Sequence, residues 1–173
     1  MSILRSSILV IFLLFTTHAF PEQKIAFIDM DKLISTSKSG SSILKQLTNL
    51  NKKNLKFLND EEIKFKEKEK KLISQKNIIS ETDFENKVNE LKSEIKIYNQ
   101  NRKKMLADFN KLKLDNTNSF LKLINPILIK FSNDKEIAII LQKKDLVVAK
   151  TQLDITDEVI KIVNSEVKEF KIK

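Results

Sequence analysis

The chain of 173 residues has no cysteine and no tryptophan, and only one histidine and one glycine. Without cysteine it can form no disulfide, no thiolate metal site and no cysteine nucleophile. A single glycine, Gly40, cannot build the glycine-rich loop that holds phosphates in P-loop ATPases. The histidine, His18, lies in an N-terminal segment that we expect to be cleaved off. We therefore expect no catalysis, no metal ion and no cofactor.

The N-terminal segment has the features of a signal peptide. Arg5 provides a positive charge, Ile8 to Phe15 form an apolar run, and Ala19 supplies the small residue before a cleavage site. The run of eight residues is too short to cross a bilayer, which needs roughly 20. This length argues against the alternative, an uncleaved membrane anchor. We predict that residues 1–19 are the signal peptide, that the protein is exported, and that the mature chain begins near Phe20.

The N-terminal end of the mature chain predicts a strand followed by a short helix. Lys24 to Asp29 form a short run of β-forming apolar residues, and Asp31 to Ser35 suit a single helical turn or two. The polar cluster from Thr36 to Gly40 is expected to break that helix. Ser41 or Ser42 would then cap the next one.

The C-terminal end predicts two more strands and a helix. Two apolar runs, Ile137–Leu141 and Leu146–Ala149, are separated by a length that suits a β-hairpin. Thr156 is a suitable N-cap for a final helix whose apolar residues would face a core. We predict that residues 20–40 and 132–173 together form one small α/β body.

The residues between these ends, 41–131, predict two long helices. The first extends from Ser41 to about Ile79, where no proline or glycine occurs and apolar residues recur at helical spacing. Four polar residues interrupt this stripe: Asn51, Glu62, Glu69 and Lys76. We expect Asn51, Glu62 and Glu69, together with Arg102 on the second helix, to loosen the packing between the two helices.

The second long helix has a cleaner pattern. Thr82 and Glu85 have the spacing of a capping box, and a heptad repeat extends from Phe84 to Leu112, broken at Arg102. After a polar gap around Asn116 the apolar pattern resumes. Pro126 is expected to bend or end the helix.

Folding about a turn near Glu81 would bring the two stripes together in antiparallel register. We therefore predict an α+β fold that is mainly helical, in which a long antiparallel α-helical hairpin is inserted into a small β-containing body suited to oligomerisation. The pairs expected across the hairpin are Leu72 with Leu91, Phe65 with Tyr98, Leu58 with Met105, and Leu55 with Phe109.

The excess of positive charge lies on the hairpin. Residues 41–131 contain 20 Lys and Arg against 12 Asp and Glu, whereas the rest of the mature chain has 11 of each. A net charge of +8 on this segment predicts attraction to acidic partners. The candidates for electrostatic capture are Lys66, Lys68, Lys70, Lys71 and Arg102.

Three runs at the chain ends resemble the Skp/OmpH family of periplasmic chaperones: Ile25–Met30, Asp145–Ala149 and Leu153–Ile160. The resemblance covers the whole mature chain in its order of elements. It implies a periplasmic homotrimer in which three hairpins project as tentacles around a cavity that holds unfolded outer-membrane proteins without ATP. The hub of that trimer would involve Ile25, Phe27, Ile139, Leu141, Val147 and Ala149.

The resemblance also names lipopolysaccharide, or an anionic membrane surface, as a further partner, with no residue of this chain assigned to it. The stripe of the hairpin is first of all its core, and we predict that the same side chains also contact clients. These candidates are Leu55, Leu58, Phe65, Leu72, Leu91, Tyr98, Met105 and Phe109.

Two other functions are considered. An exported coiled-coil spacer or tether of the cell envelope would explain the heptads, but it needs no α/β body. Specific nucleic-acid binding is suggested by the pI near 9.5. The expected signal peptide, and the absence of an aromatic or Arg-rich reading surface, argue against it.

Overall fold

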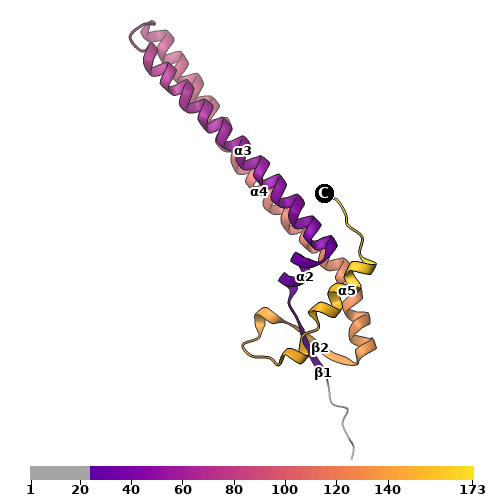
Figure 1. Cartoon of the computed structure of the whole chain (residues 1–173). Coiled ribbons are helices and arrows are strands. Elements are labelled where there is room, and N and C mark those ends of the chain that lie inside the picture. The colour runs from indigo at the N-terminus through magenta and orange to yellow at the C-terminus, as the bar shows by residue number, and fades with distance from the viewer. Residues whose placement is uncertain (1–23) are drawn as a thin grey trace, which may run out of the picture.

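The computed structural model describes residues 24–173, and the predicted signal peptide, residues 1–19, lies outside this range. In Figure 1 two long helices project as an arm from a small body formed by both ends of the described chain. The arm consists of α3 (Lys38–Gln75) and α4 (Glu81–Lys135), which run antiparallel. The predicted fold class, a helical hairpin inserted into a small α+β body, is confirmed.

The arm begins earlier than predicted. Ser37 is the N-cap of α3, and its hydroxyl accepts a hydrogen bond from the amide of Gly40 at 3.2 Å. The prediction that Ser41 or Ser42 caps this helix is therefore wrong. Within the polar cluster only Ser37 lies outside a helix. Ser39 and Gly40 are buried in the first turn of α3, where this helix packs against α2 (Met30–Thr36).

The second arm helix also starts at a serine that precedes the predicted cap. The Ser80 hydroxyl accepts a hydrogen bond from the amide of Asp83 at 3.1 Å, so Ser80 and not Thr82 is the N-cap of α4. Ser80 and Asp83 have the same three-residue spacing as Thr82 and Glu85. The local sequence pattern is therefore compatible with two start positions for α4, and the helix begins at the first of them.

Pro126 was predicted to bend or end the helix; it lies inside α4, which continues to Lys135, so the helix does not end there. A proline in a helix interior costs about 3 kcal/mol. Its neighbours Ile124, Ile127 and Phe131 are buried against the body, and each buried apolar side chain stabilises the fold by about 1.5–3 kcal/mol. Burial therefore outweighs the lost helical hydrogen bond.

The sheet has a different composition from the one predicted. β1 (Lys24–Ile28) pairs in parallel with β2 (Ile137–Gln142), and these are the two strands of the described residues. The predicted hairpin partner, Leu146–Ala149, is not a strand: it lies between two short 3₁₀ helices, Lys143–Asp145 and Thr151–Leu153. β-forming residues favour an extended backbone but do not determine which strand edge they meet.

A polar junction joins the first strand to the last helix, α5 (Thr156–Glu166). The Thr156 hydroxyl accepts a hydrogen bond from the amide of Asp29 at 2.9 Å, and the Thr156 amide donates to Asp154 at 2.9 Å. Thr156 is thus the first residue of α5 and not its predicted N-cap. Asp29 in turn caps α2 by accepting from the amide of Lys32.

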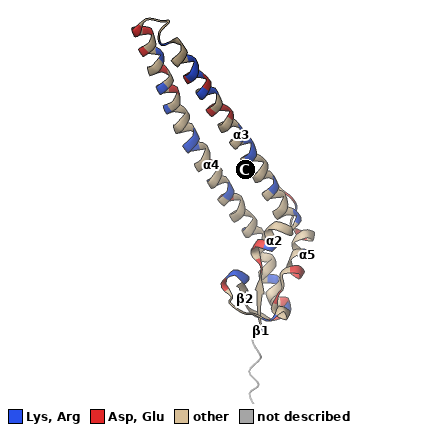
Figure 2. Cartoon of the chain, turned by 60° about the vertical axis from the view of Figure 1, so that its left-hand side comes forward, with Lys and Arg blue, Asp and Glu red and all other residues tan. Residues whose placement is uncertain are grey.

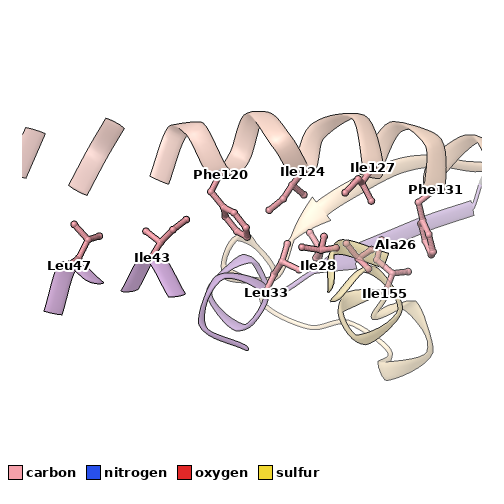
Figure 3. Packing of buried hydrophobic residues seen from close by; sticks show 12 residues of the cluster. Ala26, Ile28, Leu33, Ile43, Leu47, Phe120, Ile124, Ile127, Phe131 and Ile155 are labelled. Atoms are coloured by element: carbon pink, nitrogen blue, oxygen red, sulfur yellow. The ribbon is translucent and has the colours of Figure 1, made fainter. Parts of the chain in front are cut away.

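The core lies where the inner part of α4 crosses the body. Figure 3 shows Phe120, Ile124 and Ile127 pointing from α4 toward the residues of β1, α2 and α5. Phe120 and Ile124 have no exposed surface. The other buried members of this cluster are Ala26, Ile28, Leu33, Ile43, Leu47, Phe131, Ile155, Val159 and Val163.

The contact between α2 and α3 predicts an unusual response to mutation of Gly40. In a helix interior, glycine to alanine normally stabilises by about 0.5–1 kcal/mol. Here an added Cβ would lie 2.2 Å from the carbonyl oxygen of Ile34, so the backbone would have to move. We expect Gly40→Ala to lower the free energy of unfolding by about 1–3 kcal/mol. Urea denaturation followed by circular dichroism measures this change.

The matched control is Thr48→Ala, an exposed position on the same helix. It should leave the free energy of unfolding within about 0.5 kcal/mol of the wild-type value. A Gly40→Ala variant as stable as this control would contradict the close packing of α2 on α3.

Candidate functional site

The two helices of the arm meet along a narrow seam. The rings of Phe65 and Tyr98 lie 5.3 Å apart in an edge-to-face arrangement, as the predicted register requires. Leu72 and Leu91, another predicted pair, line one hollow near the tip. Toward the base the same register continues, because Asn54 lines a hollow with Met105 and Phe109. The predicted pair of Leu55 with Phe109 is one residue away from this register, so Asn54 and not Leu55 takes the position opposite Phe109.

Polar residues within the seam bond to each other across the helices. The Tyr98 hydroxyl has two acceptors for its single proton, the carboxylate of Glu62 at 3.0 Å and the carbonyl of Leu58 at 3.2 Å. Arg102 lies 3.5 Å from the same carboxylate. Glu62 and Arg102, predicted as interruptions that loosen the seam, thus form part of its contacts. Burial, and then the hydrogen bond to Glu62, raise the pKa of Tyr98 above its usual value.

Most of the stripe residues predicted to contact clients are covered by the partner helix. Leu58 is buried, and the others except Leu55 are partly buried in the seam. Leu55 is 54% exposed and lies outside it. The seam is thin, since Leu58 is the only buried residue of the range 48–115. These side chains hold the helices together and become fully accessible only where the helices separate.

A second set of apolar side chains lies on the outside of the arm, and of its members the sequence analysis predicted only Leu55 as a client contact. Single exposed apolar residues are ordinary on protein surfaces, but here they recur along both helices from the tip to the base. For most of them the signal in the sequence is an apolar residue off the stripe; Leu44, Leu55 and Ile95 belong to the stripe itself. The exposed members are Leu44, Leu55, Phe57, Ile63, Ile73, Ile78, Ile95, Ile97, Leu106 and Leu114.

The predicted basic candidates differ in their surroundings. Lys68 pairs with Glu94 across the helices, and Arg102 pairs with Glu62. Lys66, Lys70 and Lys71 are exposed, and the described residues provide none of them with an ion pair. Figure 2 shows Lys and Arg along both helices of the arm. Their positive charge is therefore spread along its length.

The sheet brings together four of the six predicted hub residues. Ile25 is the register partner of Ile139, and Phe27 is the partner of Leu141, so these four side chains share one face. Phe27 is buried, whereas the other three are exposed. The remaining two, Val147 and Ala149, lie in the segment after β2, where Val147 is 99% exposed.

Neither a metal site nor a membrane span occurs in the described part of the chain. Residues 24–173 contain no cluster of three His, Cys, Asp or Glu side chains that could hold a metal ion. None of their helices combines the length and the apolar character needed to cross a bilayer.

Comparisons with known proteins agree with this architecture. Residues 24–163 match the family model described as outer membrane protein (OmpH-like). A crystal structure from Caulobacter crescentus CB15, described as "a putative outer membrane chaperone (OmpH-like)", has the same fold with a TM-score of 0.71. It is 16% identical, and the match covers 90% of this chain and 92% of that one. No curated protein matches.

The raised pKa of Tyr98 can be measured directly, because the chain has one tyrosine and no tryptophan. We expect tyrosinate absorbance of the folded protein to titrate above the value of about 10 for a free tyrosine. The same titration in urea should return to about 10. Since the fold favours the neutral phenol, this contribution to stability is complete below pH 10 and is lost as the pH rises through the folded pKa.

Glu62→Gln should lower the folded pKa of Tyr98 toward 10, because it removes the carboxylate beside the hydroxyl. Glu67→Gln, an exposed carboxylate on the same helix, serves as the control and should leave it unchanged. Equal titration curves for the two variants would contradict the Tyr98–Glu62 contact.

Proposed function

Because the chain belongs to the OmpH-like outer membrane protein family, we propose that it is a periplasmic chaperone that holds unfolded outer-membrane proteins in soluble form without nucleotide. The observation that supports this most directly is the set of exposed apolar side chains along the arm. Such side chains offer an unfolded polypeptide many separate places of contact. The body has no part in this contact and keeps the base of the arm in place.

Contacts of this kind suit binding that is reversible without an energy source. An apolar side chain contributes about 1.5–3 kcal/mol when it is fully buried, and a residue on an open helix surface is only partly covered by a client. Each contact is therefore weak, and the client gains affinity from their number. A client held in this way can leave one contact at a time.

The thin seam allows the arm to adapt to clients of different size. Elements with few buried contacts open at low free-energy cost, and within residues 48–115 only Leu58 is buried. Local separation of α3 and α4 would expose the stripe residues, among them Phe65, Met105 and Phe109. The stripe and the outer apolar residues then contact the client together.

We also propose that three copies assemble through the body. Ile25, Ile139 and Leu141 form an exposed apolar face on a two-stranded sheet, and exposed sheet edges and faces favour association. Val147 and Val148, almost fully exposed, provide β-forming residues next to that sheet. In the proposed trimer these exposed side chains would contact a neighbouring copy.

The chaperone proposal is tested by diluting a urea-denatured outer-membrane barrel protein with and without the exported chain, in the absence of nucleotide. We expect light scattering to be suppressed at one trimer per client. Phe57→Ser together with Ile97→Ser should weaken suppression several-fold, because both side chains are about half exposed and are removed from the arm surface.

The matched control, Asn59→Ser with Asn99→Ser, changes exposed neighbours on the same two helices and should suppress aggregation as the wild type does. Unchanged scattering with the wild-type chain would disprove the holdase function. Equal activity of the two double variants would disprove the role of the outer apolar residues.

The positive arm predicts that capture depends on ionic strength. Charges on its surface attract an acidic client over about 8–10 Å at physiological salt, and less at higher salt. We expect the association rate with an acidic barrel protein to fall as salt rises, and Lys66→Gln, Lys70→Gln and Lys71→Gln together to reduce that dependence. Stopped-flow fluorescence measures both, and association that is independent of salt would remove the electrostatic part of the proposal.

A further inference from the structure

The last seven residues, 167–173, follow α5 without forming a helix or a strand and turn back toward the arm. Figure 1 shows this C-terminal tail rising from α5 beside the lower part of the arm, and in Figure 2 the C-terminus lies between α3 and α4. The family match ends at residue 163, within α5 and before the tail.

Two side-chain amides, one from each arm helix, bind the tail. Gln46 of α3 donates to the carbonyl of Phe170 at 3.0 Å and accepts from the amide of Ile172 at 3.3 Å. Asn116 of α4 donates to the carbonyl of Lys173 at 3.2 Å and accepts from its amide at 3.3 Å. All four hydrogen bonds reach main-chain atoms of the tail. Three of them involve a peptide carbonyl or amide such as any extended segment carries, and the fourth reaches a main-chain oxygen of the last residue, Lys173.

From Phe170 to Lys173 the side chains of the tail alternate between two environments, after two exposed residues, Lys168 and Glu169. Phe170 and Ile172 are partly buried against the core, together with Val167, whereas Lys171 and Lys173 are exposed. This alternation is the pattern of an amphipathic strand. We use the term groove for the surface at the base of the arm on which the tail lies, between Gln46 and Asn116. Its contacts are with main-chain atoms of the tail and with the apolar side chains of Phe170 and Ile172.

Asn116 shows that the groove is adapted to a main-chain partner. It occupies the polar gap in the heptad pattern of α4 and is 4% exposed. Without the tail, its side chain keeps one hydrogen bond within the described residues, to the carbonyl of Leu112 in its own helix. Buried amides are normally satisfied, and a leucine at this position would pack the seam without needing a partner.

We propose that this groove, between Gln46 and Asn116, binds extended segments of unfolded clients whose apolar residues alternate, and that the C-terminal tail occupies it when no client is bound. This inference rests on the proposed chaperone function. Strands of outer-membrane barrels alternate apolar and polar residues, so their unfolded segments fit the pattern that the tail displays.

The tail is placed to compete with a client and to be displaced by one. A tethered segment acts at an effective concentration in about the millimolar range, so it keeps weak segments out. Its first part is incompletely packed, since a hollow of about 620 Å³ lies between Glu166–Phe170 and the α4 residues Leu123, Pro126 and Ile127. A client segment can enter beside the tail at this hollow before the tail leaves.

The first test follows the tail itself in the full chain. Hydrogen exchange is measured at the amides of Ile172 and Lys173, which Gln46 and Asn116 accept from, with and without a denatured barrel protein. We expect both amides to be protected in the free protein and to exchange like an unstructured peptide once the client is bound. Light scattering in the same samples reports whether the client is held at all.

The second test opens the groove. The open variant, Phe170→Ser with Ile172→Ser, removes the apolar face of the tail without changing its charge. The control variant, Glu169→Gln with Lys171→Gln, changes the exposed face of the tail and also keeps its net charge. The probe is a labelled peptide with the sequence of residues 167–173, and the comparison peptide has the same composition with its apolar residues adjacent. We expect the first variant to bind the probe at least about fivefold more tightly than the wild type and the control variant, because its groove is free.

Asn116→Leu added to the open variant should abolish this gain, while the leucine maintains the seam. If clients are held but the tail amides stay protected, or if the open variant binds the probe no better than the control, the inference is overturned and the chaperone function stands. If no variant holds a client, the proposed chaperone function is disproved, and a client segment is also excluded as the occupant of the groove. If the open variant instead loses its oligomeric state, the groove serves a second copy of the chain, and the proposal is equally overturned.

Discussion

The parallel pairing of β1 with β2 is the contact on which the rest of the structure depends. Parallel strands cannot be joined by a tight turn and need a long crossover. In this chain the crossover is the whole arm with α2 at its start, so both ends of the hairpin are fixed in one body. A free coiled coil has no such constraint. The pairing thus separates this architecture from a spacer rod and gives the arm a defined base from which to act.

Burial changes sharply along the hairpin, and this gradient divides it into two parts. The inner part of α4 places Phe120 and Ile124 in a core without exposed surface, whereas the outer part has a seam with one buried residue. The inner part resists opening because opening would expose much apolar area, and the outer part does not. An arm that is rigid at its base and adaptable toward its tip can hold clients of different size without losing its position on the body.

Sequence periodicity was sufficient for the features that depend on one stretch of chain. The heptads gave two matched helices, and the facing of Phe65 and Tyr98 followed from spacing alone. Periodicity failed to predict the features that depend on a contact with a residue distant in sequence. Leu146–Ala149 has the composition of a strand, but β2 already pairs with β1. Pro126 has a clear local cost, which burial of its neighbours outweighs. The partners of Tyr98 and Asn116 depend on register and on the tail, and no local pattern indicates them.

The position of the tail connects these two parts of the arm. Gln46 and Asn116 lie where the hairpin passes from its buried base to its thin seam, and the tail bonds to one helix through each of them. A segment that bridges both helices at this boundary resists their separation, since parting α3 from α4 would break one of the two sets of bonds. If a client segment displaces the tail as proposed, the same event removes this bridge and favours opening of the arm. In this way the protein can couple client binding to a change in the arm through hydrogen bonds and apolar contacts alone.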